Sequence, residues 1–450
     1  MIEPSRNNIM NSSDITEFKN RRLALMQSMH TGIAIIPTSP EAIRNRDSHY
    51  PYRFDSYFYY VTGFKEPESL LILLAGDVSK GHAPKSILFC RDKDMEREIW
   101  DGFRYGPAAA VTEFGFDEAY SITQLDEMLP KLLANQAKLF YSLGADVAWD
   151  ARVSNWLNQV KAQVRTGVSA PDDIADVRKL VDEMRLFKSP AEQALMRRSA
   201  GIAAGAHKRA MQKVRAGKME YEIEAEFLHE FYRFGAQAPA YTSIVAGGAN
   251  ACTLHYNANN ARLNDGDLLL IDAGCELDGY ASDITRTFPV NGKFSAAQKD
   301  VYELVLAAQA AAISKVSTNS HWNLPHEAAL DVLVQGFIDF GWCKGSKDAV
   351  LESGAYRQFY MHRTGHWLGL DVHDAGEYKD KAGNWRMLEA GMMLTVEPGC
   401  YIRPAENVPE HFWNIGIRIE DDVLVTANGC DVITIEAPKS VADIESVMAQ

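Results

Sequence analysis

Short apolar runs alternate with amphipathic segments along the first part of the chain. The runs are rich in Ile, Leu, Tyr and Phe and are bounded by Gly, Pro or Asp, a pattern typical of β-strands. Strands are therefore predicted at residues 32–36, 57–62, 69–74 and 86–90. Helical periodicity predicts helices at residues 94–100, 122–135 and 150–164. The alternation of these elements predicts an N-terminal α/β domain.

A domain boundary is expected where the charged helical stretch 176–188 ends. Ser189, Pro190 and Glu192 form a capping box with Pro at the first helical position, which starts a new helix. Further helices are predicted at 223–235, from a second capping box at 295–298, and at 325–340; strands are predicted at 268–273, 280–288, 393–397 and 415–420. We divide this α+β chain into domains at residues 1–180 and 181–450.

The composition describes an acidic globular protein. The 450 residues include 46 Lys and Arg against 60 Asp and Glu, a net charge of −14, which argues against a nucleic-acid partner. The longest apolar run, residues 70–75, is too short to span a membrane. Residues 1–19 lack the apolar core of a secretory signal, and the six cysteines include no C-x-x-C pair, so a cytoplasmic location is expected.

Two aspartates flank a predicted hairpin. Asp272 ends one apolar strand, and Asp283 lies eleven residues later in the next. Asp278 and Gly279 between them are a hairpin signal. If these two form the loop, Asp272 opposes Thr285 and Asp283 lies diagonally; if the loop is shifted by one residue, the two aspartates face each other. Either register places both carboxylates on one side of the sheet, within about 8 Å.

Each aspartate alone is best interpreted as an exposed turn residue. Together, beside apolar neighbours, the two acids repel each other and lose solvation unless cations or donors compensate them. A bound metal ion is the simplest compensation.

Three histidines and two glutamates extend this candidate site. His362, His366 and His373 lie within 12 residues, in a segment that Gly365 and Gly369 indicate to be a loop leading into a strand. Glu397 precedes a Pro-Gly turn, and Glu420 lies two residues after Arg418 on one face of a strand. For Arg418 and Glu420 alone, a salt-bridged surface is the simpler interpretation.

The candidate ligands carry hard donor atoms and no thiolate. They are Asp272, Asp283, His366, Glu397 and Glu420. Such ligands suit Mn²⁺, or Co²⁺ and Zn²⁺ in a catalytic setting. Four carboxylates balance two divalent ions, which can activate a water for attack on a carbonyl.

These motifs, in this order, resemble the pita-bread metallopeptidases. The resemblance covers roughly residues 180–440 and implies two divalent ions, with Asp283 and Glu420 bridging, Asp272 bidentate, and His366 and Glu397 on one metal each. Within the family, the run Tyr59–Glu68, the motif Glu98-Ile99-Trp100 and the run His366–Asp374 are most similar to Xaa-Pro aminopeptidases. That similarity extends over almost the whole chain and implies a creatinase-type N-terminal domain. Arg363 and Thr364 depart from the family pattern without touching a ligand.

The resemblance also implies an activity and residue roles. The substrate would be a peptide with Pro second, whose first bond is a tertiary amide that proteases reading N–H groups handle poorly. Glu397 would shuttle a proton to the proline nitrogen, His255, His362 and His373 would orient substrate and stabilise the oxyanion, and Arg418 would support a ligand carboxylate. Prolidase, which cuts only Xaa-Pro dipeptides, is the main alternative. Methionine aminopeptidases generally lack such an N-terminal domain, and a metal-free binding module would not need all five ligands.

The N-terminal domain carries no catalytic motif of its own. By resemblance to bacterial relatives, it would form homodimers or homotetramers, narrow the entrance for peptides, and place Trp100 at a neighbouring subunit's site.

Overall fold

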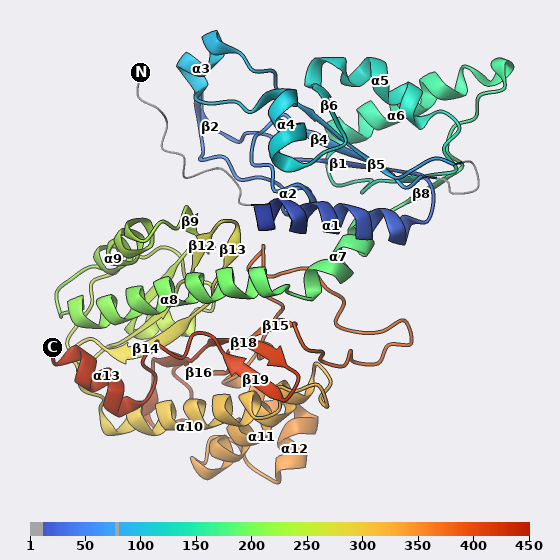
Figure 1. Ribbon diagram of the computed structural model, residues 1–450. Coiled ribbons are helices and arrows are strands. Elements are labelled where there is room, and N and C mark those ends of the chain that lie inside the picture. The colour runs from blue at the N-terminus through green and yellow to red at the C-terminus, as the bar shows by residue number, and fades with distance from the viewer. Residues whose placement is uncertain (1–11, 77–80) are drawn as a thin grey trace. The chain divides into compact units, whose positions relative to one another are not determined.

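The structure is a computed structural model that describes residues 12–76 and 81–450. Residues 1–11, which include most of the polar segment weighed as a targeting signal, lie outside the described residues. The chain divides into two compact units, Met1–Met184 and Arg185–Gln450 (Figure 1). Among the described residues, no helix is long and apolar enough to cross a membrane.

The first unit is built on a six-stranded mixed sheet with strand order β6-β5-β4-β1-β7-β8. Its strands are β1 (Ile33–Pro37), β4 (Leu70–Leu74), β5 (Lys85–Cys90), β6 (Glu118–Ser121), β7 (Lys138–Phe140) and β8 (Asp173–Ala175), with a separate ribbon of β2 (Ile43–Asn45) and β3 (Ser48–His49). Its helices are α1 (Ser12–Met29), α2 (Ser56–Thr62), α3 (Met95–Asp101), α4 (Gly106–Phe114), α5 (Leu125–Leu133) and α6 (Val147–Lys161). Helix α7 (Arg178–Leu186) crosses the unit boundary.

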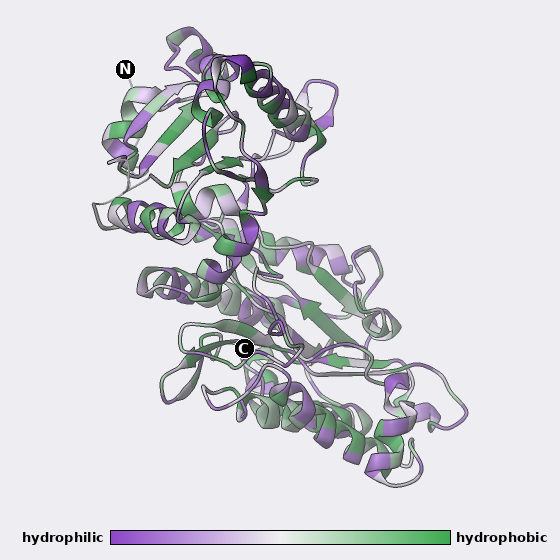
Figure 2. Ribbon diagram, turned by 90° about the vertical axis from the view of Figure 1, so that its right-hand side faces the viewer, coloured by the Kyte–Doolittle hydropathy of each residue, from purple (hydrophilic) through white to green (hydrophobic). Residues whose placement is uncertain are grey.

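The apolar runs predicted three of the central strands correctly. Strands β1, β4 and β5 occupy the segments expected at 32–36, 69–74 and 86–90. Nearly all their residues are buried, which explains why they read as continuous apolar runs without alternation. Figure 2 shows these strands as apolar bands inside the unit.

The predicted strand at 57–62 was wrong, because the segment forms helix α2. Asp55 caps the helix by accepting a hydrogen bond from the Phe58 amide at 2.9 Å, and Gly63 ends it with a φ of 66°. These two end signals outweigh the strand propensity of the Tyr, Phe and Val side chains between them.

The second unit contains several short strands. They are β9 (Ala238–Pro239), β10 (Ile244–Gly247), β11 (Leu268–Asp272), β12 (Cys275–Leu277), β13 (Tyr280–Ala281), β14 (Thr285–Pro289), β15 (Met393–Val396), β16 (Gly399–Ile402), β17 (Ile415–Arg418), β18 (Asp421–Thr426) and β19 (Gly429–Val432). They pair in the orders β10-β11-β14, β13-β12-β9, β15-β18-β19 and β16-β17. The helices are α8 (Pro190–Lys213), α9 (Glu220–Arg233), α10 (Ala296–Ile313), α11 (Leu324–Asp339), α12 (Lys347–Ser353) and α13 (Val441–Met448).

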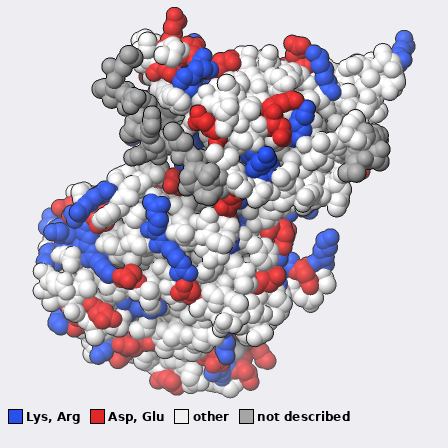
Figure 3. Space-filling model, in the orientation of Figure 1, with Lys and Arg blue, Asp and Glu red and all other residues white. Residues whose placement is uncertain are grey.

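Two helix pairs enclose these strands. Figure 1 shows α8 and α9 on one side and α10 and α11 on the other. Both predicted capping boxes are present, at the starts of α8 and α10. On the face shown in Figure 3, acidic and basic side chains are interspersed on each unit.

The hairpin that carries the two aspartates takes the first of the two predicted registers. Leu277 opposes Tyr280, and Asp272 opposes Thr285. The expected continuous strand at 280–288 is interrupted between β13 and β14, and Asp283 lies in the interruption. Just before Asp283, the Ser282 amide donates a hydrogen bond to the Cys275 carbonyl, with an N···O distance of 3.1 Å.

The histidine segment does not lead into a strand, contrary to expectation. It follows β15 only as far as Leu368, whose amide donates to the Met393 carbonyl. It then folds back, because buried Asp374 pairs with Arg185 and Lys188. His373 is therefore placed by this buried ion cluster and not by strand alternation.

We expect Gly274→Ala to disrupt the fold of the second unit. A Cβ at this position would lie 1.7 Å from the backbone carbonyl oxygen of Ser282. Both Gly274 and Ser282 are buried, so neither can move easily to relieve the overlap. The close approach is what brings Asp272 and Asp283 together. Thermal melts should show loss of the cooperative transition or a large fall in Tm.

Gly201→Ala is the matched control. Among the described residues, a Cβ there would meet no heavy atom within 4 Å, and the residue lies inside α8. This substitution should stabilise by about 0.5–1 kcal/mol through reduced backbone entropy. A Gly274→Ala protein that melts like the wild type would contradict the proposed close contact.

Candidate metal centre

Asp272 and Asp283 lie together as the hairpin argument required. A single tyrosine hydroxyl joins them: Tyr241 contacts Asp272 Oδ1 at 2.6 Å and also Asp283 Oδ1. One hydroxyl proton is shared between two carboxylates, so the negative charge of the pair is only partly compensated.

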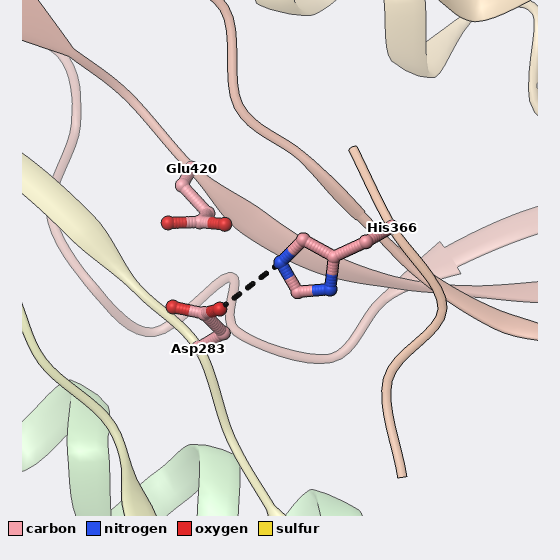
Figure 4. A group of neighbouring side chains, drawn as sticks. All are labelled: Asp283, His366 and Glu420. Atoms are coloured by element: carbon pink, nitrogen blue, oxygen red, sulfur yellow. Dashed lines mark ion pairs between the residues drawn. The ribbon is translucent and has the colours of Figure 1, made fainter. Parts of the chain in front are cut away.

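His366 presents its Nε2 atom to this pair. Its Nδ1 lies 2.9 Å from the Trp367 carbonyl oxygen and donates to it, because a carbonyl can only accept. In the neutral ring this leaves a lone pair on Nε2, the form in which histidine binds metals. Nε2 lies 3.4 Å from Asp283 Oδ2, the pair joined by the dashed line in Figure 4.

The two glutamates complete the group. Glu397 follows β15 with Oε1 3.6 Å from His366 Nε2. Glu420 follows β17, is 1% exposed, and accepts from the Thr285 hydroxyl at 2.7 Å. Ligand atoms of Asp283, His366 and Glu420 lie within 4.8 Å of one another, and their side chains point toward a common centre (Figure 4).

Arg418 is buried behind the acids, so the surface interpretation of Arg418 and Glu420 was wrong. Its guanidinium donates to Asp272 Oδ2 at 2.7 Å, to the Tyr401 hydroxyl at 2.9 Å and to the Thr285 hydroxyl at 3.2 Å. It is the cation that directly contacts the Asp272 carboxylate. Its position agrees with a supporting role for a ligand.

The remaining predicted residues occupy different environments. His362 Nε2 lies 2.8 Å from the Tyr401 hydroxyl, and the His373 ring lies 4.2 Å from that of His366. His255 is exposed on the loop after β10. Trp100 lies on α3 in the first unit and is 84% exposed.

The pKa values of the site residues are shifted because several carboxylates are buried close together. Burial, reinforced by the neighbouring carboxylates, raises the pKa of Asp283 and of Glu420, and burial raises the pKa of Glu397 to about 7 against the opposing effect of His366. Burial alone would lower the pKa of His366, but Asp283 and Glu397 outweigh it and raise the value to about 9. His362 is the opposite case, because burial and Arg418 lower its pKa to about 3.

The residues present fit divalent cations. Asp283 and Glu420 are almost fully buried, yet each carries a carboxylate beside others of the same sign. Protons can neutralise this excess, but so can divalent ions, which oxygen and imidazole donors bind well. The donor set contains no cysteine and therefore fits a catalytic site better than a structural one.

Sequence reasoning missed three hydroxyl groups that organise the site. They belong to Tyr241, Tyr401 and Thr285. Thr285 could have been found, because the predicted register already placed it opposite Asp272. Tyr241 lies 31 residues before Asp272 in a segment with no motif, so only the fold reveals its contact.

Comparison with known proteins places this geometry in a family. Residues 194–427 match Metallopeptidase family M24, and residues 18–141 match Aminopeptidase P, N-terminal domain. The chain is 45% identical over 434 residues to the Xaa-Pro aminopeptidase of Haemophilus influenzae, covering 96% of this chain and 97% of the relative. The chain belongs to metallopeptidase family M24.

Solved structures agree with this one along nearly the whole chain. The structure resembles aminopeptidase PepP of Pseudomonas aeruginosa with a TM-score of 0.94, 48% identity and coverage of 97% and 98% of the two chains. It resembles Escherichia coli aminopeptidase P, solved in complex with substrate and also in a Zn-substituted form with product, with a TM-score of 0.93, 43% identity and the same coverage. The predicted architecture, an α/β N-terminal domain followed by a pita-bread catalytic domain, is confirmed.

The crowded acids of this M24 site predict a pH-dependent stability of the metal-free protein. Folded Glu397 keeps its proton to about pH 7 and folded His366 to about pH 9. In the unfolded chain the same groups titrate near about 4.3 and about 6.5. From about pH 7 to 9, where His362 is neutral in both states, the folded state therefore binds more protons through His366, and stability falls as pH rises through that range.

Thermal melts in a chelator at a series of pH values measure this slope. Saturating Mn²⁺ should flatten it, because bound ligands are already deprotonated. Relative to the wild type, Glu397→Gln should make the dependence of Tm on pH more positive between pH 5 and 7, whereas Glu352→Gln, at an exposed glutamate on α12, should not. A Tm of the metal-free protein that rises from pH 7 to pH 9 would contradict the pKa shift assigned to His366.

Proposed function

We propose that this M24 protein is an Xaa-Pro aminopeptidase, which removes the first residue from peptides whose second residue is proline. The carrying observation is the convergence of all five ligand-type side chains at one buried site, in a chain that matches Xaa-Pro aminopeptidases over 96% of its length. Hydrolysis of peptides by an M24 metallopeptidase requires such a site.

The proposed centre holds two divalent ions. Asp272, Asp283, His366, Glu397 and Glu420 would bind them. Four carboxylates balance two divalent charges, and oxygen-rich donors favour Mn²⁺. When bound, the ions supply an activated water and polarise the scissile carbonyl.

The chain's own residues supply proton transfer and orientation. Glu397, one of the assigned ligands, is also assigned to accept a proton and pass it to the proline nitrogen. Burial and Arg418 keep His362 neutral, and its ring is held by the Arg363 carbonyl at Nδ1 and the Tyr401 hydroxyl at Nε2. His255 and His373 are the other imidazoles assigned to orienting the substrate and stabilising the oxyanion. Arg418 holds Asp272 in place.

Product analysis separates this activity from its alternatives. We expect the Mn²⁺-loaded protein to release the first residue from a tripeptide Xaa-Pro-Yaa, and chelation to remove the activity until Mn²⁺ is restored. Replacing Pro by Ala in the same tripeptide should abolish release, since the site is assigned to the tertiary amide. Asp283→Asn and Glu420→Gln should lose turnover and bound metal together.

Three other results would each overturn the proposal in a distinct way. Cleavage of Xaa-Pro dipeptides alone would identify a prolidase. Release of Met without regard to proline would identify a methionine aminopeptidase. Absence of bound metal after loading would identify a binding module that has lost catalysis.

The first unit is proposed to gate the site and to form a homodimer or homotetramer. Helix α3 and the turn after it expose a contiguous set of apolar side chains: Met95 at 71%, Ile99 at 81%, Trp100 at 84% and Phe103 at 56%. Exposed apolar groups clustered in this way mark interaction surfaces. The six free cysteines, five of them buried, suit the reducing cytoplasm proposed as its location.

We expect Trp100→Ala to raise KM for long peptides more than for tripeptides. The reason is that only the longer chains extend past the scissile bond toward a neighbouring subunit. Val111→Ala on α4, at a less exposed apolar residue of the same unit, is the control. Sedimentation velocity gives the assembly state, and a strictly monomeric protein, or unchanged kinetics at every peptide length, would remove this role.

A further inference from the structure

Glu220 is a fully buried carboxylate outside the metal centre. It is the first residue of helix α9 and is 0% exposed. Its Oε1 accepts from the Gly247 amide at 2.8 Å and from the Asn250 side-chain amide at 3.0 Å. Its Oε2 accepts from the Tyr256 hydroxyl at 2.7 Å and from the Ala261 amide at 2.8 Å. Four donors and the helix N-terminus together stabilise its negative charge.

All four donors belong to one segment of the chain. Gly247 and Asn250 precede the exposed loop that begins at Thr253, Tyr256 lies within it, and Ala261 closes it. One carboxylate therefore ties the beginning, the middle and the end of a single loop. The residue next to Tyr256 is His255.

Two further clamps fix the ends of this loop. Buried Asn259 accepts from the Val245 amide at 3.0 Å and donates to the Ser243 carbonyl at 2.8 Å, which ties the loop to β10. The Arg403 guanidinium donates to the Cys252 carbonyl at 2.8 Å. The Tyr256 hydroxyl is thus the side-chain tie nearest to His255, whose own side chain is exposed.

His255 is the imidazole that this loop contributes to the three assigned to substrate. The pKa of His362 is lowered chiefly by burial and Arg418 and also by His255, and the pKa of His373 is lowered by burial, by His366 and by His255. His255 comes from a segment more than 100 residues before His362 and His373, so its alignment with them depends on how the His255 loop is held.

We propose that Glu220 and Tyr256 are positioning residues that hold His255 in the orientation needed for substrate. This inference rests on the proposed function, because it gives His255 a role in turnover. Glu220 touches neither substrate nor metal ligand in this assignment and acts only through the loop.

The chemistry of the Glu220 pocket makes its substitutions informative. In Glu220→Gln, one oxygen becomes an NH₂ group, which cannot accept from the donors facing it. If the amide nitrogen faces Tyr256, the hydroxyl can reverse its role, but the partly buried Ala261 amide loses its acceptor. Tyr256→Phe is gentler, because it removes one hydrogen bond and keeps the ring.

The experiment compares Mn²⁺-loaded wild type, Tyr256→Phe and Glu220→Gln on a tripeptide Xaa-Pro-Yaa. We expect kcat to fall about 10-fold in Tyr256→Phe, while KM changes less and the metal content is unchanged. The reason is that a misplaced group slows the reaction more than it weakens substrate binding. Tyr221→Phe is the matched control, since it makes the same change at the next residue after Glu220 on an exposed tyrosine. Its kinetics should equal those of the wild type.

A double-mutant cycle with His255→Ala separates positioning from general destabilisation. If Tyr256 acts through His255, Tyr256→Phe should have no further effect on kcat in the His255→Ala background. An equal effect in both backgrounds, or wild-type kinetics for Tyr256→Phe, would overturn the inference. A wild type that does not cleave the tripeptide would instead refute the proposed function.

Hydrogen exchange provides a readout that does not depend on activity. Amides in the segment 248–262 should exchange faster in Tyr256→Phe and in Glu220→Gln than in Tyr221→Phe, while the amides of β11 and β14 stay protected. Unchanged exchange in this segment would show that Glu220 does not hold the loop.

Discussion

Like charges confined in one buried volume are the constraint on which the catalytic unit depends. At an effective dielectric of about 20, two carboxylates about 4 Å apart repel by about 4 kcal/mol. Tyr241 offers one proton to two aspartates, and Arg418 offers its charge to Asp272. Glu420 accepts a hydrogen bond from the neutral hydroxyl of Thr285, and the neighbouring carboxylates still raise its pKa. The site therefore favours cations before any substrate arrives.

Because the acids repel one another, the backbone must hold them together, and a buried polar layer fixes that backbone. The Gln309 amide on α10 contacts the carbonyls of Val396 and Ile419, the residues just before Glu397 and Glu420. Arg286 pairs with buried Asp421 at 2.7 Å and also contacts the Glu420 carbonyl. Removing one partner from such a buried network leaves an uncompensated charge, which costs about 3–5 kcal/mol. The metal site is thus as rigid as the core behind it.

The sequence allowed correct prediction of features that local rules control. The capping boxes at Ser189 and Ser295 depend on a few neighbouring residues and were predicted correctly, and the hairpin takes one of the two registers that its turn residues left open. The helix at 56–62 was predicted as a strand because its Tyr, Phe and Val side chains favour strands, whereas Asp55 and Gly63 at its ends favour a helix. The backbone path to His373 could not be predicted, since it depends on Asp374 meeting Arg185 from a segment 189 residues away.

The site combines two supports that respond differently to metal. The acids depend on cations or protons from outside the chain, so their arrangement is incomplete in the metal-free protein. The charge of Glu220, by contrast, is satisfied entirely by donors of the chain itself, so the loop that carries His255 needs no metal to be ordered. Because the loop that carries His255 is already ordered before substrate binds, less reorganisation is needed during catalysis. Metal loading and substrate orientation can therefore fail separately, and a variant that retains full metal can still lose turnover.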